Sequence, residues 1–500
     1  MEERQAKLRR LASVGIAHSK LVALLDKLRN DPLLPSDVVN KQSLSRAVLV
    51  LFEELGYTEV LAGTNCEITW DCLSFPLVLQ YMVKKFKSFR NVAGDLWTKR
   101  PCSALNPYSL VMFADEVTPG NVLRLDNKRK TLCIYVTIRE FGSRYIKDEK
   151  CWLPIAAIRS VVAKGVLGGQ SACVAMILDR MFIRDRIRDD GILLDLGGGR
   201  HVNLFFQLGN IIADVEGHRA IWSAKGASGK LPCLLCLNVL SEHVESDYLV
   251  HFSCADADLF DIASDSDIWK KADILESESR TATKKAFDRL QMVHGLTYSP
   301  HGLLWSMPLR RYVSPTTCIT YDSMHCIMSN GIGQFEVGLL LGGLKTIGTS
   351  WEHVRDFATA DWHFPSAIGR KSLGDVFGKP REEAWKRDLS IKAGAAELLS
   401  ALPVLLHFLH KVIAPKGVLD LQTKSLTLLG WVVDLVRRGK DGQDCHVDLR
   451  TAIRQHAEMM SRAYPEAEKN RNITTPCIWP SNCRSTGRSL MPSWVSESMA

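Results

Sequence analysis

An unbroken apolar run, Leu110-Val-Met-Phe-Ala114, ends in Asp115-Glu116 and is followed at once by the breaker Thr118-Pro-Gly120. Apolar residues without polar interruption are typical of a central strand that is buried on both faces. A carboxylate placed directly after such a strand has left the core and faces a crevice at the sheet edge. The chain is therefore expected to build a covered sheet, and Asp115 is its first candidate functional residue.

The same arrangement recurs further along the chain, where Leu208-Gly-Asn-Ile-Ile-Ala213 leads to Asp214. Two aspartates at strand ends of one domain suit a two-metal phosphoryl-transfer site. Magnesium prefers hard oxygen ligands, and the paired ions lie about 3.5–4 Å apart, so the carboxylates must converge. We therefore expect Asp115 and Asp214 to face each other from adjacent strands.

Composition narrows the class of protein. The 500 residues, 46% hydrophobic and 24% charged, are typical of a globular protein with more than one structural unit. The charged N-terminus does not resemble a signal peptide, and no uninterrupted apolar stretch is long enough to span a membrane. The 14 cysteines lie mostly singly in apolar contexts, as reduced thiols do. We expect an intracellular protein without a membrane partner, whose net charge of +8 permits a polyanionic one.

Hydrophobic periodicity divides the chain into five regions. Helical spacing dominates residues 1–104, strand spacing begins in 105–220, and an acidic, cysteine-containing stretch occupies 221–319. Helical spacing returns over 320–415 and continues in 416–500, which ends in an irregular tail. We expect the third region to be an insertion within the domain that contains the two aspartates.

Strand and helix patterns alternate within residues 105–220. The patterns predict three consecutive antiparallel strands near 108–115, 122–125 and 131–138, then two helices over 152–183, then strands at 192–196 and 202–214. The order β-β-β-α-β, with aspartates closing the first and a late strand, is that of a ribonuclease-H-like domain. The expected fold is thus an α/β ribonuclease-H-like mixed sheet, interrupted by an insertion and flanked by helical regions.

The segment Cys233-Leu-Leu-Cys236 is a candidate zinc site. Two thiolates at this spacing hold one tetrahedral zinc ion, which then needs two further ligands. His218, His243 and His325 could complete the set, and we expect His325 and His218 to do so. Two packed thiols without a metal explain the pair equally well.

A third metal carboxylate is less clearly marked. Glu397 stands alone in an apolar helical stretch, where a glutamate is costly unless it is paired or bound to a metal. A Lys or Arg partner would explain it equally. Glu336 is the alternative, because it lies on roughly the same helical face as Asp322. Asp322 and His325 also share a face, although helix capping and the helix dipole account for them as well.

The glycines of Leu193-Leu-Asp-Leu-Gly-Gly-Gly199 are similar to the cofactor-binding turn of a Rossmann-type methyltransferase. That turn must join a strand to a helix, so that the ligand meets the helix N-terminus. The residues that follow, Val202 to Phe206, have strand spacing instead. We therefore expect a hairpin turn at Gly197–Gly199, which disfavours a methyltransferase.

Taken together, the order Asp, Asp, Cys-x2-Cys, Asp-x2-His and late Glu resembles the cut-and-paste DNA transposase superfamily, closest to its CACTA/Plavaka-like branches. The resemblance covers roughly residues 105–415. It implies metal-dependent DNA cleavage and strand transfer by Asp115, Asp214 and Glu397 (or Glu336), with Mg²⁺ or Mn²⁺. It also implies a structural Zn²⁺, DNA as the partner and a nuclear location, and it leaves a homo-oligomer open.

The chain departs from this superfamily at both ends. Residues 1–100 contain only Cys66 and Cys72, without a matching His/Cys set for a DNA-binding finger. The C-terminus lacks the basic, His-containing end that the resemblance implies. A degenerate or domesticated copy is therefore expected. The alternative is a non-catalytic, transposon-derived DNA- or chromatin-binding protein.

Overall fold

The computed structural model describes residues 54–117, 130–148, 151–252, 254, 256–329, 331–360, 370–388, 390–440 and 443–465. The strand expected at 122–125 and the irregular tail lie outside these residues.

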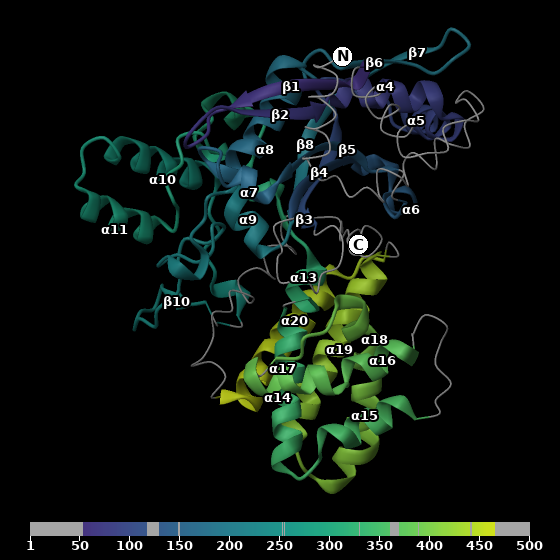
Figure 1. The fold of residues 1–500 in the computed structure, drawn as a ribbon, viewed down its shortest axis with the longest axis vertical. Coiled ribbons are helices and arrows are strands. Elements are labelled where there is room, and N and C mark those ends of the chain that lie inside the picture. The colour runs from purple at the N-terminus through teal and green to yellow at the C-terminus, as the bar shows by residue number, and fades with distance from the viewer. Residues whose placement is uncertain are drawn as a thin grey trace.

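The described chain forms a sheet-containing part and a helical part, which meet near α13 (Figure 1). The strands are β1 (Gly56–Leu61), β2 (Ile68–Leu73), β3 (Tyr108–Val117), β4 (Thr131–Ile138), β5 (Leu153–Arg159), β6 (Ile192–Asp195), β7 (His201–Leu204), β8 (Phe206–Ala213), β9 (Val239–Leu240), β10 (Val250–His251) and β11 (Ile319–Tyr321). The helices are α4 (Phe75–Lys85), α5 (Lys87–Lys99), α6 (Ser143–Ile146), α7 (Ser160–Ala163), α8 (Gly169–Asp179), α9 (Val215–Ile221), α10 (Asp265–Glu278), α11 (Lys284–His294), α12 (Pro315–Cys318), α13 (Ser323–Ile327), α14 (Ile332–Thr346), α15 (Trp351–Thr359), α16 (Arg370–Val376), α17 (Lys379–Asp388), α18 (Ala395–Phe408), α19 (Asp420–Lys440) and α20 (His446–Ala463).

A mixed sheet of seven strands organises the first part, in the order β1-β2-β5-β4-β3-β8-β11. Neighbouring strands from β1 to β3 are antiparallel, whereas β8 runs parallel to β3 and β11 runs parallel to β8. The expected mixed α/β class is therefore confirmed. The three parallel strands end at the same edge of the sheet.

Strand β3 is buried on both faces, as its apolar run predicts. Every residue from Tyr108 to Ala114 is buried. Leu110 and Met112 belong to the large hydrophobic core of the first part, while Val111 and Phe113 belong to a smaller cluster on the opposite face. Both faces of the strand are covered, which leaves its C-terminal end as the exit from the core.

The prediction that residues 1–104 are helical is wrong for β1 and β2, which extend the sheet. In β2, Trp70 and Cys72 are buried and alternate with more exposed residues, which is the period of a strand. Helical spacing describes only α4 and α5 among the described residues of this region. The preceding leucine-rich segment, 1–53, lies outside the described residues.

The prediction of two helices over 152–183 is wrong in its first part. Leu153–Arg159 is β5, the third of the consecutive antiparallel strands, and only α7 and α8 follow it as helices. Ile155 and Ile158 are three residues apart, which suits a helix as well as a strand. The open edge of β4 supplies hydrogen-bonding partners that no local pattern reveals, and this pairing decides the outcome.

Residues Gly197–Gly199 form the turn of a β6–β7 hairpin, as predicted. Strands β6 and β7 are antiparallel, with Asp195 opposite His201. The three glycines have φ values of +83°, +62° and +76°. Glycine adopts such values at little cost, which explains three in succession.

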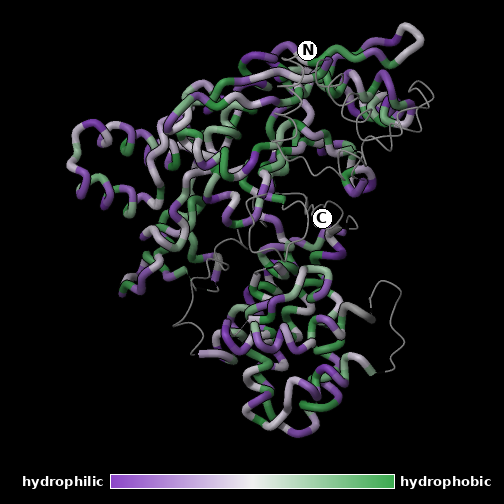
Figure 2. The backbone as a smooth tube through the Cα atoms, viewed as in Figure 1, coloured by the Kyte–Doolittle hydropathy of each residue, from purple (hydrophilic) through white to green (hydrophobic). Residues whose placement is uncertain are grey.

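The segment between α9 and β11, which the sequence predicts to be an insertion, contains the short pair β9–β10 and the helix hairpin α10–α11 (Figure 1). The hairpin carries many hydrophilic residues along its length (Figure 2). Leu275 of α10, Leu296 and Trp305 nevertheless join the large core of the first part. The insertion is thus packed against the sheet-containing part.

Helices α13–α20, which we call the helical body, have a separate hydrophobic core. Leu405 of α18 and Leu429 of α19 share it, so the helices on both sides of residue 415 pack together. Among the described residues, one helical stretch, Ala395–Lys416, is long and apolar enough to cross a membrane, with 44% of its most apolar window buried. A core helix passes the same test, and α18 supplies Leu398 and Leu402 to this core.

Glu336 of α14 lies fully buried inside the helical body, with 0% of its surface exposed. Its Oε1 accepts a hydrogen bond from the Ser425 hydroxyl at 2.6 Å, and its Oε2 lies 2.6 Å from His456 Nε2. A buried carboxylate is tolerated only when its oxygens are satisfied. The cluster therefore ties together α14, α19 and α20.

We predict that His456→Ala lowers the free energy of unfolding by about 3–5 kcal/mol, because it leaves the Glu336 carboxyl buried without its imidazole partner. Urea denaturation measures the loss. Glu383→Ala, at a side chain 73% exposed, is the control and changes stability little. Replacing Glu336 and His456 together by leucine should lower the free energy of unfolding by less than His456→Ala alone. If His456→Ala leaves the free energy of unfolding unchanged, the pairing is contradicted.

Candidate functional site

Three carboxylates lie at the C-terminal ends of three neighbouring parallel strands, Asp115 still within β3 and opposite Cys133 of β4. Asp115 lies beyond Phe113, the last residue of β3 paired with β8, and Asp214 follows β8 directly. Asp322 follows β11, and its backbone N–H donates to the Ala213 carbonyl at 3.0 Å. The strands that carry Asp115 and Asp214 are adjacent, as predicted, and the facing of the two carboxylates stays a prediction. The structure adds Asp322 to the same sheet edge, which faces α13 and the helical body (Figure 1).

A buried polar pair fixes the register of β8 and β11 just before this edge. Asn210 Nδ2 donates to Thr320 Oγ1 at 2.8 Å, and both residues are buried. Because an unpaired amide there would be costly, the bond favours one alignment of the two strands. Asp322 is thereby held next to Asp214.

Asp115 lies in a half-buried environment with other acids near it. Burial is the largest effect and raises its pKa to about 6, and the carboxylates of Asp214 and Asp322 act in the same direction. The charge of His325 and a hydrogen bond from the Glu116 backbone to Asp115 Oδ1 at 2.7 Å oppose this rise. Asp115 is therefore an acid that is held near other acids at a real electrostatic cost.

Asp214 is the N-cap residue of α9. Its Oδ1 accepts a hydrogen bond from Gly217 N at 2.5 Å, which satisfies an otherwise free helix N–H. A Cβ at position 217 would lie 3.0 Å from Asp214 Oδ1, so glycine permits this close approach. The second carboxylate oxygen of Asp214 is left for another partner.

Asp322 and His325 form a pair one helical turn apart on α13. Asp322 is 4% exposed, and its Oδ2 lies 2.7 Å from His325 Nδ1. Burial opposes protonation of His325, but the hydrogen bond to Asp322 and the charges of Asp322, Asp115 and Asp214 outweigh it and raise the pKa to about 9. The imidazole is thus a cation that is bonded to one carboxylate and stabilised by the charges of two more.

The sheet edge therefore carries hard carboxylate oxygens and one imidazole, a donor set that suits a divalent cation. Among the residues that the structure describes, no three His, Cys, Asp or Glu side chains already converge as a metal-ligand set. The acids at this edge are close enough for their charges to interact, as the pKa values of Asp115 and His325 record. The sequence indicated Asp322 only as a partner of His325 on one helix face, although Ile319-Thr-Tyr321 followed by Asp322 also repeats the pattern of an apolar strand followed by an aspartate.

Neither glutamate expected as the third carboxylate belongs to this group. Glu336 is enclosed in the helical body by Ser425 and His456. Glu397 Oε2 accepts from Gly394 N at 2.5 Å at the start of α18 and forms an ion pair with Arg381 at 3.2 Å. The partner that the sequence left open is therefore an arginine. Each glutamate has a local structural explanation.

The two cysteines of Cys233-Leu-Leu-Cys236 are buried. The hydrogen bond with Cys236 lowers the pKa of the Cys233 thiol; burial opposes this effect, and the nearby charge of Lys271 adds to it. The thiols are thus close together, as the spacing predicts, and a cation is near them. This environment stabilises a thiolate with or without a metal.

The two histidines expected to complete a zinc shell have other partners. His218 Nε2 donates to the Thr320 carbonyl at 2.8 Å, and His218 Nδ1 accepts from Trp222 Nε1 at 3.3 Å. Burial lowers the pKa of His218 to about 4, so its ring is neutral. His325 is held by Asp322. Both histidines are thus engaged by the sheet edge and α9, and their completion of a zinc site with the cysteines stays a prediction.

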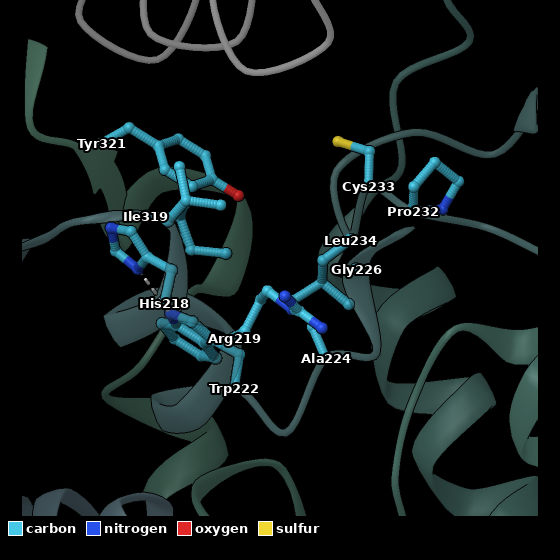
Figure 3. A pocket seen from close by; sticks show the side chains of 11 residues that line it. His218, Arg219, Trp222, Ala224, Gly226, Pro232, Cys233, Leu234, Ile319 and Tyr321 are labelled. Atoms are coloured by element: carbon cyan, nitrogen blue, oxygen red, sulfur yellow. Dashed lines mark hydrogen bonds between the residues drawn. The ribbon is translucent and has the colours of Figure 1, made fainter. Parts of the chain in front are cut away.

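Figure 3 shows His218 and Cys233 on opposite sides of a narrow pocket, with Trp222 below His218. The free volume of the pocket is about 20 Å³. This is room for about one water molecule and too little for an organic ligand.

Comparison with known protein families gives no match to this chain, and comparison with curated proteins gives none either.

We predict a pH-dependent contribution of His325 to stability. Because its pKa is raised from 6.5 to about 9 in the folded protein, the contribution is complete below pH 6.5 and is lost as the pH rises through about 9. Urea denaturation in a metal chelator compares wild type with His325→Gln across this range. The difference between the two proteins should shrink at the high-pH end, and a constant difference contradicts the predicted charge.

Zinc at Cys233 and Cys236 stays a prediction. We expect zinc in the purified protein and its loss in Cys233→Ser, because a single thiolate cannot retain the ion at this pair. Elemental analysis measures it, with the exposed Cys66→Ser as the matched control. Equal zinc in wild type and Cys233→Ser, or none in either, means that the cysteines are packed thiols.

Proposed function

We propose that this chain is a transposase-like protein that carries out metal-dependent cleavage and transfer of DNA strands. The observation that supports this most is the pair Asp115 and Asp214 at the ends of the adjacent parallel strands β3 and β8. Carboxylates that converge from neighbouring strand ends are the arrangement that a two-metal phosphoryl-transfer site requires.

We propose that the sheet is ribonuclease-H-like. The supporting observation is its order: β3, β4 and β5 are consecutive and antiparallel, and after α8 the strand β8 returns parallel to β3 on its other side. β11 then adds next to β8 after the insertion. The three parallel strands place their terminal acids at one edge.

Asp115 and Asp214 would hold Mg²⁺ or Mn²⁺, and a bound divalent ion there supplies activation of the attacking oxygen and stabilisation of the leaving oxygen. The chain prepares this edge by burying Asp115 beside other acids: burial first, and then the charges of Asp214 and Asp322, raise its pKa. Gly217 N fixes the orientation of the Asp214 carboxylate. His325 supplies a positive charge that balances the acids.

We extend the proposal to DNA as the partner, a nuclear location and a structural zinc at Cys233 and Cys236. The net charge of +8 supports a polyanionic partner. The buried, adjacent thiols support the zinc. Homo-oligomerisation belongs to the same proposal through the resemblance to transposases.

A non-catalytic DNA- or chromatin-binding protein derived from a transposon is the second candidate. The specific observation in its favour is that Glu336 and Glu397, the glutamates expected to complete a catalytic triad of acids, are both engaged within the helical body. A methyltransferase is not proposed, because Gly197–Gly199 belong to a hairpin rather than to a strand-to-helix turn.

We predict that Asp115→Asn and Asp214→Asn each reduce the nicking of supercoiled plasmid DNA in Mn²⁺ or Mg²⁺ by more than about 100-fold, because each removes a charged oxygen ligand. Asparagine is an equally good N-cap, so Asp214→Asn retains the bond from Gly217. Asp115→Asn should also raise the melting temperature, since it removes a carboxylate confined next to others.

The control for these variants is Asp95→Asn on the exposed face of α5, which should nick like wild type. Full activity of Asp115→Asn contradicts the catalytic proposal. DNA binding by a wild-type protein that never nicks, with binding unchanged in Asp115→Asn, supports the non-catalytic candidate instead.

A further inference from the structure

We infer that His325, oriented by Asp322, is a metal ligand at the Asp115–Asp214 edge, in the place where sequence reasoning expected a glutamate. This inference rests on the proposed function, since it assumes a divalent ion at Asp115 and Asp214. It goes further in assigning an imidazole to the site, and with it a preference among metals.

Asp322 is fixed too firmly to turn toward an ion itself. Its Oδ1 accepts from Met324 N at 2.9 Å, and its Oδ2 lies 2.7 Å from His325 Nδ1. Its backbone N–H is bonded to the Ala213 carbonyl, and its surface is only 4% exposed. Asp322 therefore acts through His325 and is a positioning residue.

His325 is oriented by this contact. Its Nδ1 is bonded to Asp322, which leaves Nε2 as the ring nitrogen available for another partner. The side chain is 22% exposed, in contrast to the 4% of Asp322, so its outer end reaches the accessible edge of the site. Asp322 N–H is bonded to the Ala213 carbonyl, directly before Asp214, so the ring that Asp322 holds lies near the end of β8, and the charges of Asp115 and Asp214 both raise its pKa.

A histidine that gives one ring nitrogen to a carboxylate is the usual state of a metal-binding histidine. The carboxylate fixes the tautomer and the ring plane, and the second nitrogen binds the ion. The Asp322–His325 pair already has this form, with the carboxylate in place before any metal is bound. Coordination requires the neutral ring, so the ion displaces the proton on Nε2.

An imidazole at this edge changes the metal preference. Carboxylate oxygens alone suit Mg²⁺ and Mn²⁺ alike, whereas an added nitrogen ligand favours the transition metal. The site should therefore bind Mn²⁺ more tightly than Mg²⁺, and His325→Gln should reduce this difference. Because no three of these side chains already converge, binding also requires them to move together around the ion.

Pulsed electron paramagnetic resonance of the full-length protein loaded with Mn²⁺ tests the assignment, because a coordinated imidazole gives a ¹⁴N coupling to the metal. Wild type should show this coupling, and His325→Gln should lose it while retaining Mn²⁺ more weakly. Asp322→Asn preserves the N-cap of α13 but weakens the carboxylate contact, so Mn²⁺ affinity in calorimetry should fall about 10–100-fold. His201→Gln, at an exposed histidine of β7, is the control and should match wild type.

The outcomes separate this inference from the function on which it rests. Mn²⁺ that binds wild type, is lost in Asp115→Asn and shows no ¹⁴N coupling overturns the His325 assignment and leaves the proposed function standing. Coupling that persists in His325→Gln overturns it as well. A wild-type protein that binds neither Mn²⁺ nor Mg²⁺ contradicts both.

Discussion

The parallel pairing of β8 with β3 on one side and β11 on the other is the constraint on which the candidate site depends. Parallel neighbours end at the same edge, so an acid after each strand is brought to one place without any contact between distant loops. The buried Asn210–Thr320 bond holds β11 in register. The insertion, which packs on the same core as the sheet, lies between β8 and β11 in sequence without separating them in space.

Holding several acids at one edge of the sheet lowers the stability of the fold, because their charges repel one another. Helix N-termini and a nearby imidazole reduce this cost. Asp214 is satisfied by the N-terminus of α9, and Asp322 by the N-terminus of α13. His325 supplies a cation among them, whereas Asp115 accepts a hydrogen bond from the Glu116 backbone and has its pKa raised to about 6, chiefly by burial. Carboxylates held close together lower the free energy of unfolding relative to apolar residues in the same place, and perturbed acids of this kind are a feature of candidate functional sites.

In the helical body, by contrast, a buried carboxylate has hydrogen-bonding partners for both oxygens. Glu336 is deeper than any of the site aspartates, yet Ser425 and His456 satisfy both of its oxygens. Its burial alone therefore does not mark it as functional. A glutamate in an apolar helix looks the same in the sequence whether its partner is a metal, an arginine or a histidine. Glu397 is a second example, because its partner is Arg381.

The sequence by itself determined the local features: the two-face burial of β3, the aspartates near the C-terminal ends of β3 and β8, and the glycine hairpin at Gly197–Gly199, because each depends on residues adjacent in the chain. It failed for β1, β2 and β5, whose strand state comes from pairing with distant edges. Only the tertiary structure decided which acids meet. Asp322 and His325 join Asp115 and Asp214 through the order of three parallel strands, and the two glutamates pair elsewhere, since packing partners far apart in sequence leave no local pattern.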